Sequence, residues 1–145
     1  MTIPMEFQHA SDEFEAFLRD ARDASGLTTR NQTYTMVQAV LQTFRRRLEV
    51  REAIRFAGVL PPLLRALFVT DWDPDEPKLA FTSRGDLTRE VQSLRRNHNF
   101  SPDSAIHDVA GALRRRVDQP AFDGILAQLP PGAADFWKTS QQSSH

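Results

Sequence analysis

Apolar residues recur along this chain at intervals of three and four, the spacing that lines one face of an α-helix. A first stripe runs over residues 14–21, and a longer one runs over residues 33–48. No stretch alternates apolar and polar residues for long enough to predict a β-strand. The pattern therefore predicts an all-α protein of about eight short-to-medium helices.

Polar caps and helix breakers divide the pattern into separate helices. We expect Ser11-Asp12 to begin the first helix and Ser25-Gly26 to end it. Residues 29–32, Thr-Arg-Asn-Gln, have the form of a capping box for the second helix. A third helix over residues 50–59 should end at Pro61-Pro62, which can open a fourth. Its predicted inward side chains are Ala53, Ile54, Phe56, Ala57 and Leu60.

Similar capping and helix-breaking residues mark helix boundaries in the second half of the chain. Ser83 and Asp86 can start a helix, and Ser101-Pro102-Asp103 is expected to start the next with Pro at its first position. Asp118 can cap a further helix, and Pro130-Pro131 should lead into a final short one. The polar tail, residues 139–145, is expected to fray.

The chain also contains an internal repeat. Residues 37–62 align without a gap to residues 106–131, at a constant offset of 69, with seven of 26 positions identical. Repeats of this kind govern the fold, and halves this small would each leave an apolar face bare. We therefore expect a single domain, residues 1–145, in which repeats 11–69 and 82–138 form two quasi-equivalent four-helix halves of one bundle. Residues 70–81 would link them.

The repeat predicts equivalent core residues in the two halves. Phe44 and Leu113 occupy matching positions on their apolar stripes, so both should be buried anchors. Trp72 and Trp137 follow the fourth helix of each half, and we expect both to seal the core.

Composition narrows the class of protein. Of 145 residues, 40% are hydrophobic and 26% are charged, and no apolar run approaches the roughly 18 to 20 residues that cross a bilayer. The N-terminus is acidic and lacks the features of a signal peptide, and there is no cysteine for disulfides or thiolate sites. These features predict a cytoplasmic protein that does not contact membranes.

The net charge of −1 conceals an uneven distribution. Residues 1–23 hold six acids and two Arg, whereas residues 44–66 hold six Arg and two Glu. Residues 71–78 are acidic again, with four carboxylates and one Lys. We expect these segments to pair their charges within the molecule or between subunits.

Several short motifs occur in an order that resembles a known family. A Leu-rich helix ends in Arg-x-Arg-Leu, a short helix ends in Leu-Pro, and Leu-Leu-Arg precedes a Trp-Asp-Pro corner. These motifs lie at residues 40–48, 59–61, 63–65 and 72–74, and the second half repeats Arg-Arg-Arg at 114–116 and Leu-Pro at 129–130. Over residues 14–137 the chain resembles the bacterial domain-of-unknown-function family 2267 (DUF2267). It departs from the pattern in one respect, since Gly58-Val59 stands where the second copy has Ala127-Gln128. The family has no assigned reaction, so the resemblance implies a fold and leaves function open.

Two arginine triplets are the candidate binding surface. They are Arg45, Arg46, Arg47 and, in the second copy, Arg114, Arg115, Arg116. They could form two basic patches for phosphate or nucleic acid. Alternatively, they complement the negative ends of two helices while their stems cover the core. At 100° per residue Arg46 and Arg115 point away from the core, and the flanking residues lie about 80° to either side. Triplets that spread so widely do not make one patch, which favours the structural interpretation.

No residue pattern predicts a catalytic, cofactor or metal site. None of the four His lies at i, i+3 or i, i+4 from another. His107 has Asp103 one turn before it and Asp108 beside it, which we interpret as a surface contact. There is no nucleophile elbow, Gly-rich phosphate loop or Glu-x-x-His motif. We therefore do not expect an enzyme or a bound cofactor.

Two functions from different classes remain. The first is a non-enzymatic protein-interaction or scaffold module that binds a protein partner or itself, and Met5 and Phe7 would then pack across a dimer. The alternative is a nucleic-acid-binding protein that uses Arg-rich helix ends. The sequence pI of 6.4 favours the first, because nucleic-acid binders are usually basic.

Overall fold

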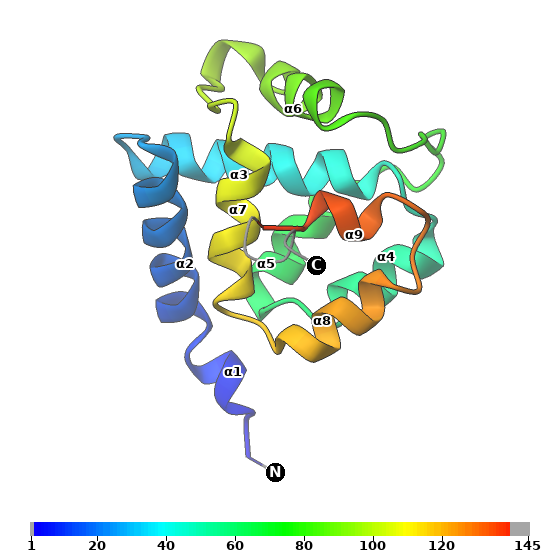
Figure 1. The fold of residues 1–145 in the computed structure, drawn as a ribbon. Helices are drawn as coiled ribbons and strands as arrows, with labels where there is room; N and C mark the ends of the chain where they lie inside the picture. Colours follow the sequence, from blue (N-terminus) through cyan, green and yellow to red (C-terminus); the bar gives the residue numbers. More distant parts are fainter. Residues whose placement is uncertain (1, 140–145) are drawn as a thin grey trace.

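The computed structural model describes residues 2–139, and within that range the chain is helical with no strand (Figure 1). The all-α prediction is thereby confirmed. Nine α-helices and one 3₁₀-helix form in the described range. They are α1 (Met5–Gln8), α2 (Ala10–Ser25), α3 (Arg30–Arg45), α4 (Val50–Ala57), α5 (Pro62–Val69), α6 (Arg84–Ser93), η1 (Arg96–His98), α7 (Ala105–Arg114), α8 (Gln119–Leu126) and α9 (Ala133–Phe136).

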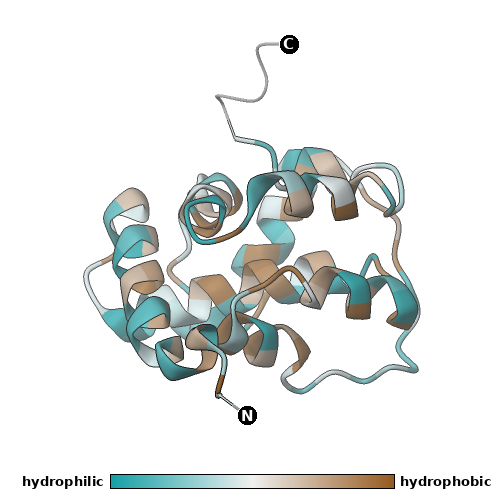
Figure 2. Ribbon diagram, turned by 90° about the horizontal axis from the view of Figure 1, so that it is seen from below, coloured by the Kyte–Doolittle hydropathy of each residue, from teal (hydrophilic) through white to brown (hydrophobic). Residues whose placement is uncertain are grey.

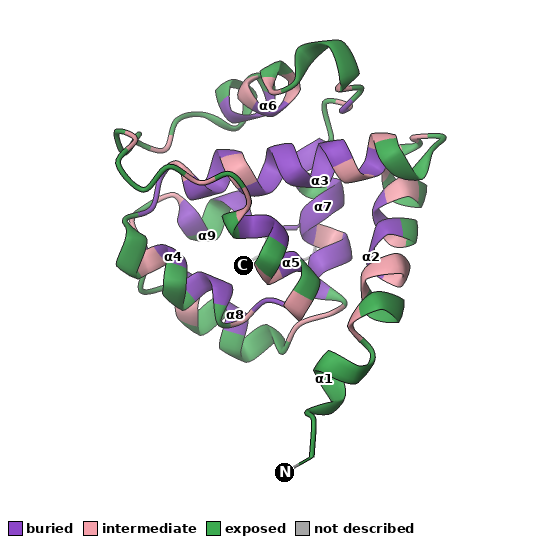
Figure 3. Cartoon of the chain, turned by 180° about the vertical axis from the view of Figure 1, so that it is seen from behind, coloured by how far each residue is buried: buried purple, intermediate pink, exposed green. Residues whose placement is uncertain are grey.

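Helix α3 is the centre of the packing. Helix α2 packs against α7 and α3, and α6 packs along the opposite side of α3 from α5 (Figure 1). Helix α4 pairs with α8, and α8 with α9. Hydrophobic segments lie mainly toward the middle in Figure 2, and Figure 3 shows α3 as largely buried and α1 as exposed.

Local signals in the sequence explain several helix boundaries. The capping box of α3 is present as predicted, with the Thr29 side chain accepting from the Gln32 N–H at 3.1 Å and the Gln32 side chain accepting from the Thr29 N–H at 3.2 Å. Helix α2 ends at Gly26, whose φ of 76° suits glycine. Helix α6 starts where Ser83 accepts a bond from the Asp86 N–H.

Two predicted helix starts are wrong. Ser11-Asp12 does not begin the first helix, because α2 already begins at Ala10 and α1 precedes it, neither with a side-chain cap. Helix α7 begins at Ala105 rather than at 101–103, so Pro102 is not its first residue. The Ser101 N–H and hydroxyl both donate to the side chain of Asn99. The expected cap is therefore used in a turn before the helix.

The core anchors are where the sequence places them, with two exceptions. Phe44 and Leu113 are buried, and the Phe44 ring lies 4.7 to 5.9 Å from the rings of four neighbours. These neighbours are Phe56, Phe81, Phe136 and Trp137. Trp137 is fully buried, whereas Trp72 is only partly buried beneath the Arg45 guanidinium, at 5.4 Å. Ile54 was expected to face inward but is 65% exposed, because α4 turns Ala53, Phe56 and Ala57 to the core instead.

The two segments that align in the sequence share some helix boundaries, although α5 and α9 do not correspond. Helices α4 and α8 begin and end 69 residues apart, and α3 and α7 both end at the first Arg of a triplet. Their side-chain packing differs, because Phe56 fills the core in the first segment while Phe122, at a different repeat position, fills it in the second. The repeat ranges 11–69 and 82–138 stay a prediction, which superposition of the two segments would test.

The segment between α5 and α6 crosses to the second half as irregular chain. It is held at Leu79, whose N–H donates to the Arg46 carbonyl at 3.0 Å. Further along, Phe81 lies against Gly132, where a Cβ would come within 2.6 Å of the Phe81 side chain. Gly132 also has a φ of 102°, so both space and backbone require glycine there. At the other end of the described chain, Thr139 is buried; the rest of the predicted tail, 140–145, lies outside the described residues.

Candidate functional site

Arg45, the first residue of the first triplet, is buried at the end of α3. Its Nη1 donates to the carbonyls of Phe68 at 2.9 Å and Thr70 at 3.0 Å, and its side chain is 4% exposed. Burial lowers the pKa of Arg45, and the nearby charge of Glu76 partly offsets that effect. These bonds satisfy carbonyls at the end of α5, so Arg45 joins that end to α3.

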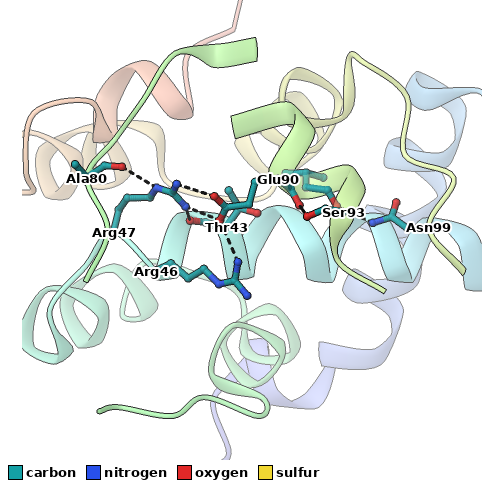
Figure 4. A network of polar contacts seen from close by, with 8 residues as sticks. Thr43, Arg46, Arg47, Ala80, Glu90, Ser93 and Asn99 are labelled. Carbon is teal, nitrogen blue, oxygen red and sulfur yellow. Dashed lines mark hydrogen bonds and ion pairs between the residues drawn. The ribbon is translucent and has the colours of Figure 1, made fainter. Parts of the chain in front are cut away.

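Arg47 and Glu90 form a second buried connection (Figure 4). The Arg47 Nη atoms donate to both Glu90 carboxylate oxygens at 2.6 and 2.7 Å, and further bonds reach the carbonyls of Thr43 at 2.8 Å and Ala80 at 3.2 Å. Arg46 donates to the same carboxylate at 3.2 Å. Burial raises the pKa of Glu90, but bonds and charges from Arg47 and Arg46 outweigh it and hold that pKa below its ordinary value. The pair joins α6 to the end of α3.

The second triplet repeats only part of this arrangement. Arg114 is 6% exposed, and its guanidinium donates to the Trp137 carbonyl at 2.8 Å and to Asp123 at 2.9 Å. The Arg114 and Arg45 bonds to carbonyls are related by the repeat offset of 69 residues. Arg116 pairs with Asp20 on α2 at 2.9 Å, while the Arg115 side chain is 71% exposed.

These positions refine the interpretation of the triplets. The helical wheel placed Arg46 and Arg115 outward, and of these Arg115 is mostly exposed whereas the Arg46 side chain is 32% exposed and paired. The helical wheel also placed Arg45 and Arg47 on the flanks of the helix, where only their aliphatic stems would be covered. In the structure their guanidinium groups are buried as well. Charge pairs and carbonyls therefore occupy most of the cations, and the six residues do not make a continuous free basic surface.

The sequence did not identify Glu90 as a partner of the first triplet. Glu90 lies 43 residues beyond Arg47 on a separate helix, so no local spacing relates the two. The sequence showed only that Glu90 is an acidic residue on a predicted helix.

An exposed apolar surface lies on the outside of α4 and α5. Val50, Ile54 and Val69 are 42%, 65% and 45% exposed, and the partly buried Trp72 lies beside them. We call these four residues the α4–α5 face. Ile54, Val69 and Trp72 line a shallow recess of about 350 Å³, together with Ala53, Ala57, Gly58 and Arg65.

Two cations flank this face. Arg51 and Arg55 are exposed, lie one turn apart on α4 and form no ion pair with another described residue. The face thus presents apolar side chains next to two arginines that pair with no acid in the described part of the chain.

A second, larger recess of about 830 Å³ opens between α1, the Pro61-Pro62 corner and the turn after α7. Gly58 and Arg65 line both recesses, so the two adjoin. Met5 lines the larger one, and Ile3, Met5 and Phe7 are 63%, 69% and 48% exposed. We call these three residues the N-terminal apolar segment.

His107 is the remaining residue that the sequence singled out. Its Nδ1 lies 3.8 Å from Asp108 Oδ1, which agrees with a surface contact, and Asp108 also accepts from the Ser104 hydroxyl at 2.6 Å. Across residues 2–139 no three His, Asp or Glu side chains gather closely enough to hold a metal ion. Nor does any described helix have the length and hydropathy needed to cross a membrane.

The helix order, the buried arginines at two helix ends and the Leu-Pro corners define an all-helical protein of the class that the sequence motifs predict. The family described as "Uncharacterized conserved protein (DUF2267)" matches residues 14–136. The chain belongs to this family, and the resemblance is confirmed. No curated protein matches the sequence.

Proposed function

We propose that the chain is a non-enzymatic protein-interaction or scaffold module that binds a partner through the α4–α5 face. The observation that carries the proposal is the grouping of exposed apolar residues around Trp72. Ile54 and Val69 line one recess with Trp72, and Val50 lines another with it. Single exposed apolar residues are ordinary, but neighbouring ones rimmed by charge are typical of interaction sites.

The side chains on this face suit an interface. Burying an exposed Ile or Val contributes about 1.5 to 3 kcal/mol, so Ile54 and Val69 would be its main aliphatic anchors. Trp72 adds an aromatic side chain of the kind enriched among residues that dominate binding energy. Arg51 and Arg55 at the rim would favour an acidic partner and speed its association.

Nucleic-acid binding is the less favoured alternative. The guanidinium groups of Arg45, Arg47 and Arg114 already donate to carbonyls and carboxylates within the chain. Nucleic-acid binding needs cations that are free to neutralise backbone phosphates and so displace the counterions condensed on the nucleic acid. Buried arginines that are already paired do not supply them. The sequence pI of 6.4 argues in the same direction.

Site-specific photocrosslinking in the native host tests the interaction proposal. A crosslinking amino acid at position 54 should capture one defined protein, because the side chain there is the most exposed of the four on the face. The same group at Arg89, exposed on α6, is the matched control and should not capture it. When the crosslinking amino acid is placed at position 50 instead, the Ile54→Asp substitution should abolish the crosslinked adduct. The spectrum of that variant should remain helical. Equal capture from positions 54 and 89, or no capture from position 54, would contradict the proposal.

A further inference from the structure

We infer that the partner of the α4–α5 face is a second copy of this chain, whose N-terminal apolar segment docks on it in a symmetric dimer. Each copy would contribute its Ile3, Met5 and Phe7 to the face of the other. The inference rests on the proposed function, because it uses the same face, and it adds the identity of the occupant.

Helix α1 buries none of its residues against the rest of the described chain, although Met5 lines the larger recess and Glu6 approaches Arg65. It is four residues long, has no buried residue and lacks a side-chain cap. A single helical turn of this kind is marginal in water unless an apolar face packs against something. Figure 3 shows it projecting from the end of α2, exposed along its length.

The two surfaces carry charged residues that could pair with each other. Glu6 lies within the N-terminal apolar segment and is 52% exposed, and its one ion-pair contact among described residues is a 3.9 Å approach to Arg65. Asp12 follows on α2 and forms no ion pair in the described part of the chain. The α4–α5 face carries the unpaired Arg51 and Arg55. Glu6 and Asp12 beside the segment could therefore pair with Arg51 and Arg55 beside the face.

The positions of the two surfaces suit a two-fold axis. A symmetric dimer needs one self-complementary patch. Where residue i of one copy contacts residue j of the other, residue j of the first copy also contacts residue i of the second. The recess that Met5 lines and the recess of the α4–α5 face share Gly58 and Arg65. An axis close to these two residues would place each N-terminal apolar segment over the other copy's face. Both contacts would then form together, and the assembly would close at two subunits.

Sedimentation velocity of the purified full chain, between about 1 and 100 μM, measures the dimer directly. We expect a dimer that dissociates on dilution. Met5→Glu/Phe7→Glu, which alters only exposed side chains, and Ile54→Glu/Val69→Glu should each raise the dissociation constant by at least about tenfold. Phe100→Glu, at a 60% exposed residue on neither surface, is the control and should leave it unchanged. Circular dichroism and the thermal midpoint check that each variant folds.

Mixing the two double variants gives the sharpest result. Each would be monomeric alone, but a mixed pair retains one intact segment over one intact face, so a heterodimer should form more tightly than either homodimer. The Arg51→Glu/Arg55→Glu variant should form a weaker dimer than the wild type. Adding Glu6→Arg/Asp12→Arg to the same chain should restore dimer formation.

A wild-type chain that stays monomeric at 100 μM would overturn the inference, as would a dimer unaffected by both double variants or a mixture with no heterodimer. If the chain is monomeric while position 54 still crosslinks a different protein, the inference fails and the proposed function survives. If position 54 captures nothing as well, both fail.

Discussion

The two arginine triplets have the same sequence and the same place at a helix end, yet their central residues differ in environment. In the first triplet all three guanidinium groups are engaged, and Arg46 shares the Glu90 carboxylate with Arg47. In the second, Arg114 and Arg116 are engaged while Arg115 is mostly exposed, with a carboxylate no nearer than 3.8 Å. The shared feature is the buried first arginine that binds a carbonyl 23 residues later.

The difference follows from what each triplet meets in space. Helix α6 packs along α3 and brings Glu90 to the first triplet, whereas the second triplet meets Asp123 on α8 and the acids of α2. The two identical motifs therefore keep the bond from the first Arg to a carbonyl 23 residues later, and they differ where the partner comes from elsewhere in the chain. This comparison predicts which substitutions are costly.

The largest effect should come from the matching core anchors of the two segments. Phe44→Ala should lower the free energy of unfolding by about 3 to 5 kcal/mol, and Leu113→Ala by about 2 to 5 kcal/mol. We expect Phe44 to be the more costly, because it contacts four aromatic rings. Chemical denaturation measures both values. Two unchanged stabilities would show that these helices do not bury the residues assigned to the core.

The triplets themselves should differ at their third positions. Arg47→Met removes one partner of a largely buried ion pair and should cost about 3 to 5 kcal/mol. Arg116→Met breaks a more exposed pair and should cost about 1 kcal/mol or less. Denaturation of the two variants under one set of conditions measures the difference. Equal losses would mean that the Glu90 contact adds nothing beyond a surface pair.

The Glu90 connection should also make stability depend on pH. The folded-state pKa of Glu90 lies below its ordinary value of 4.5, so its contribution is present above that value and is lost as the pH falls through the lower, folded pKa. Glu90→Gln should remove this contribution and flatten the acid side of the stability curve. Thermal midpoints between about pH 3 and pH 6 test it, with Asp86→Asn on the same helix as control. If the thermal midpoints of the wild type and of Glu90→Gln changed with pH in parallel, this prediction would be contradicted.

The smallest effect is expected from Arg46 and Arg115, the two arginines that the helical wheel placed outward. The Arg46→Ala/Arg115→Ala variant should bind a DNA duplex as weakly as the wild type, in gel shifts at about 50 and 200 mM salt. Tight retention of the wild type at low salt that disappears in the double variant would identify the triplets as a phosphate-binding surface instead.

Most of the fold could be predicted from the sequence because its signals are local. The capping box at 29–32, the glycine at 26 and the Ser83 cap act over three or four residues, and each works as expected. The failures occurred where a distant or competing contact decides. Ser101 bonds to the Asn99 side chain rather than capping α7. Ile54 is turned outward by the way α4 packs on α8.

The candidate surfaces were less accessible to prediction. The sequence could indicate that charged segments pair, but not that Glu90 pairs with Arg47, since the two are brought together only by the packing of α6 on α3. The α4–α5 face was likewise hidden, because Ile54 and Val69 have the apolar character of core residues. Exposure, which distinguishes them, depends on the tertiary arrangement.

The central claim is that the triplets belong to the fold, and two adjacent residues test it most directly. Chemical denaturation of Arg114→Met and Arg115→Met compares a buried arginine with an exposed one in the same triplet. Arg114→Met should lower the free energy of unfolding by about 3 kcal/mol, because it leaves the Trp137 carbonyl and Asp123 without their charged donor. Arg115→Met should change it by no more than about 0.5 kcal/mol. Equal losses, or a larger loss at Arg115, would contradict the account.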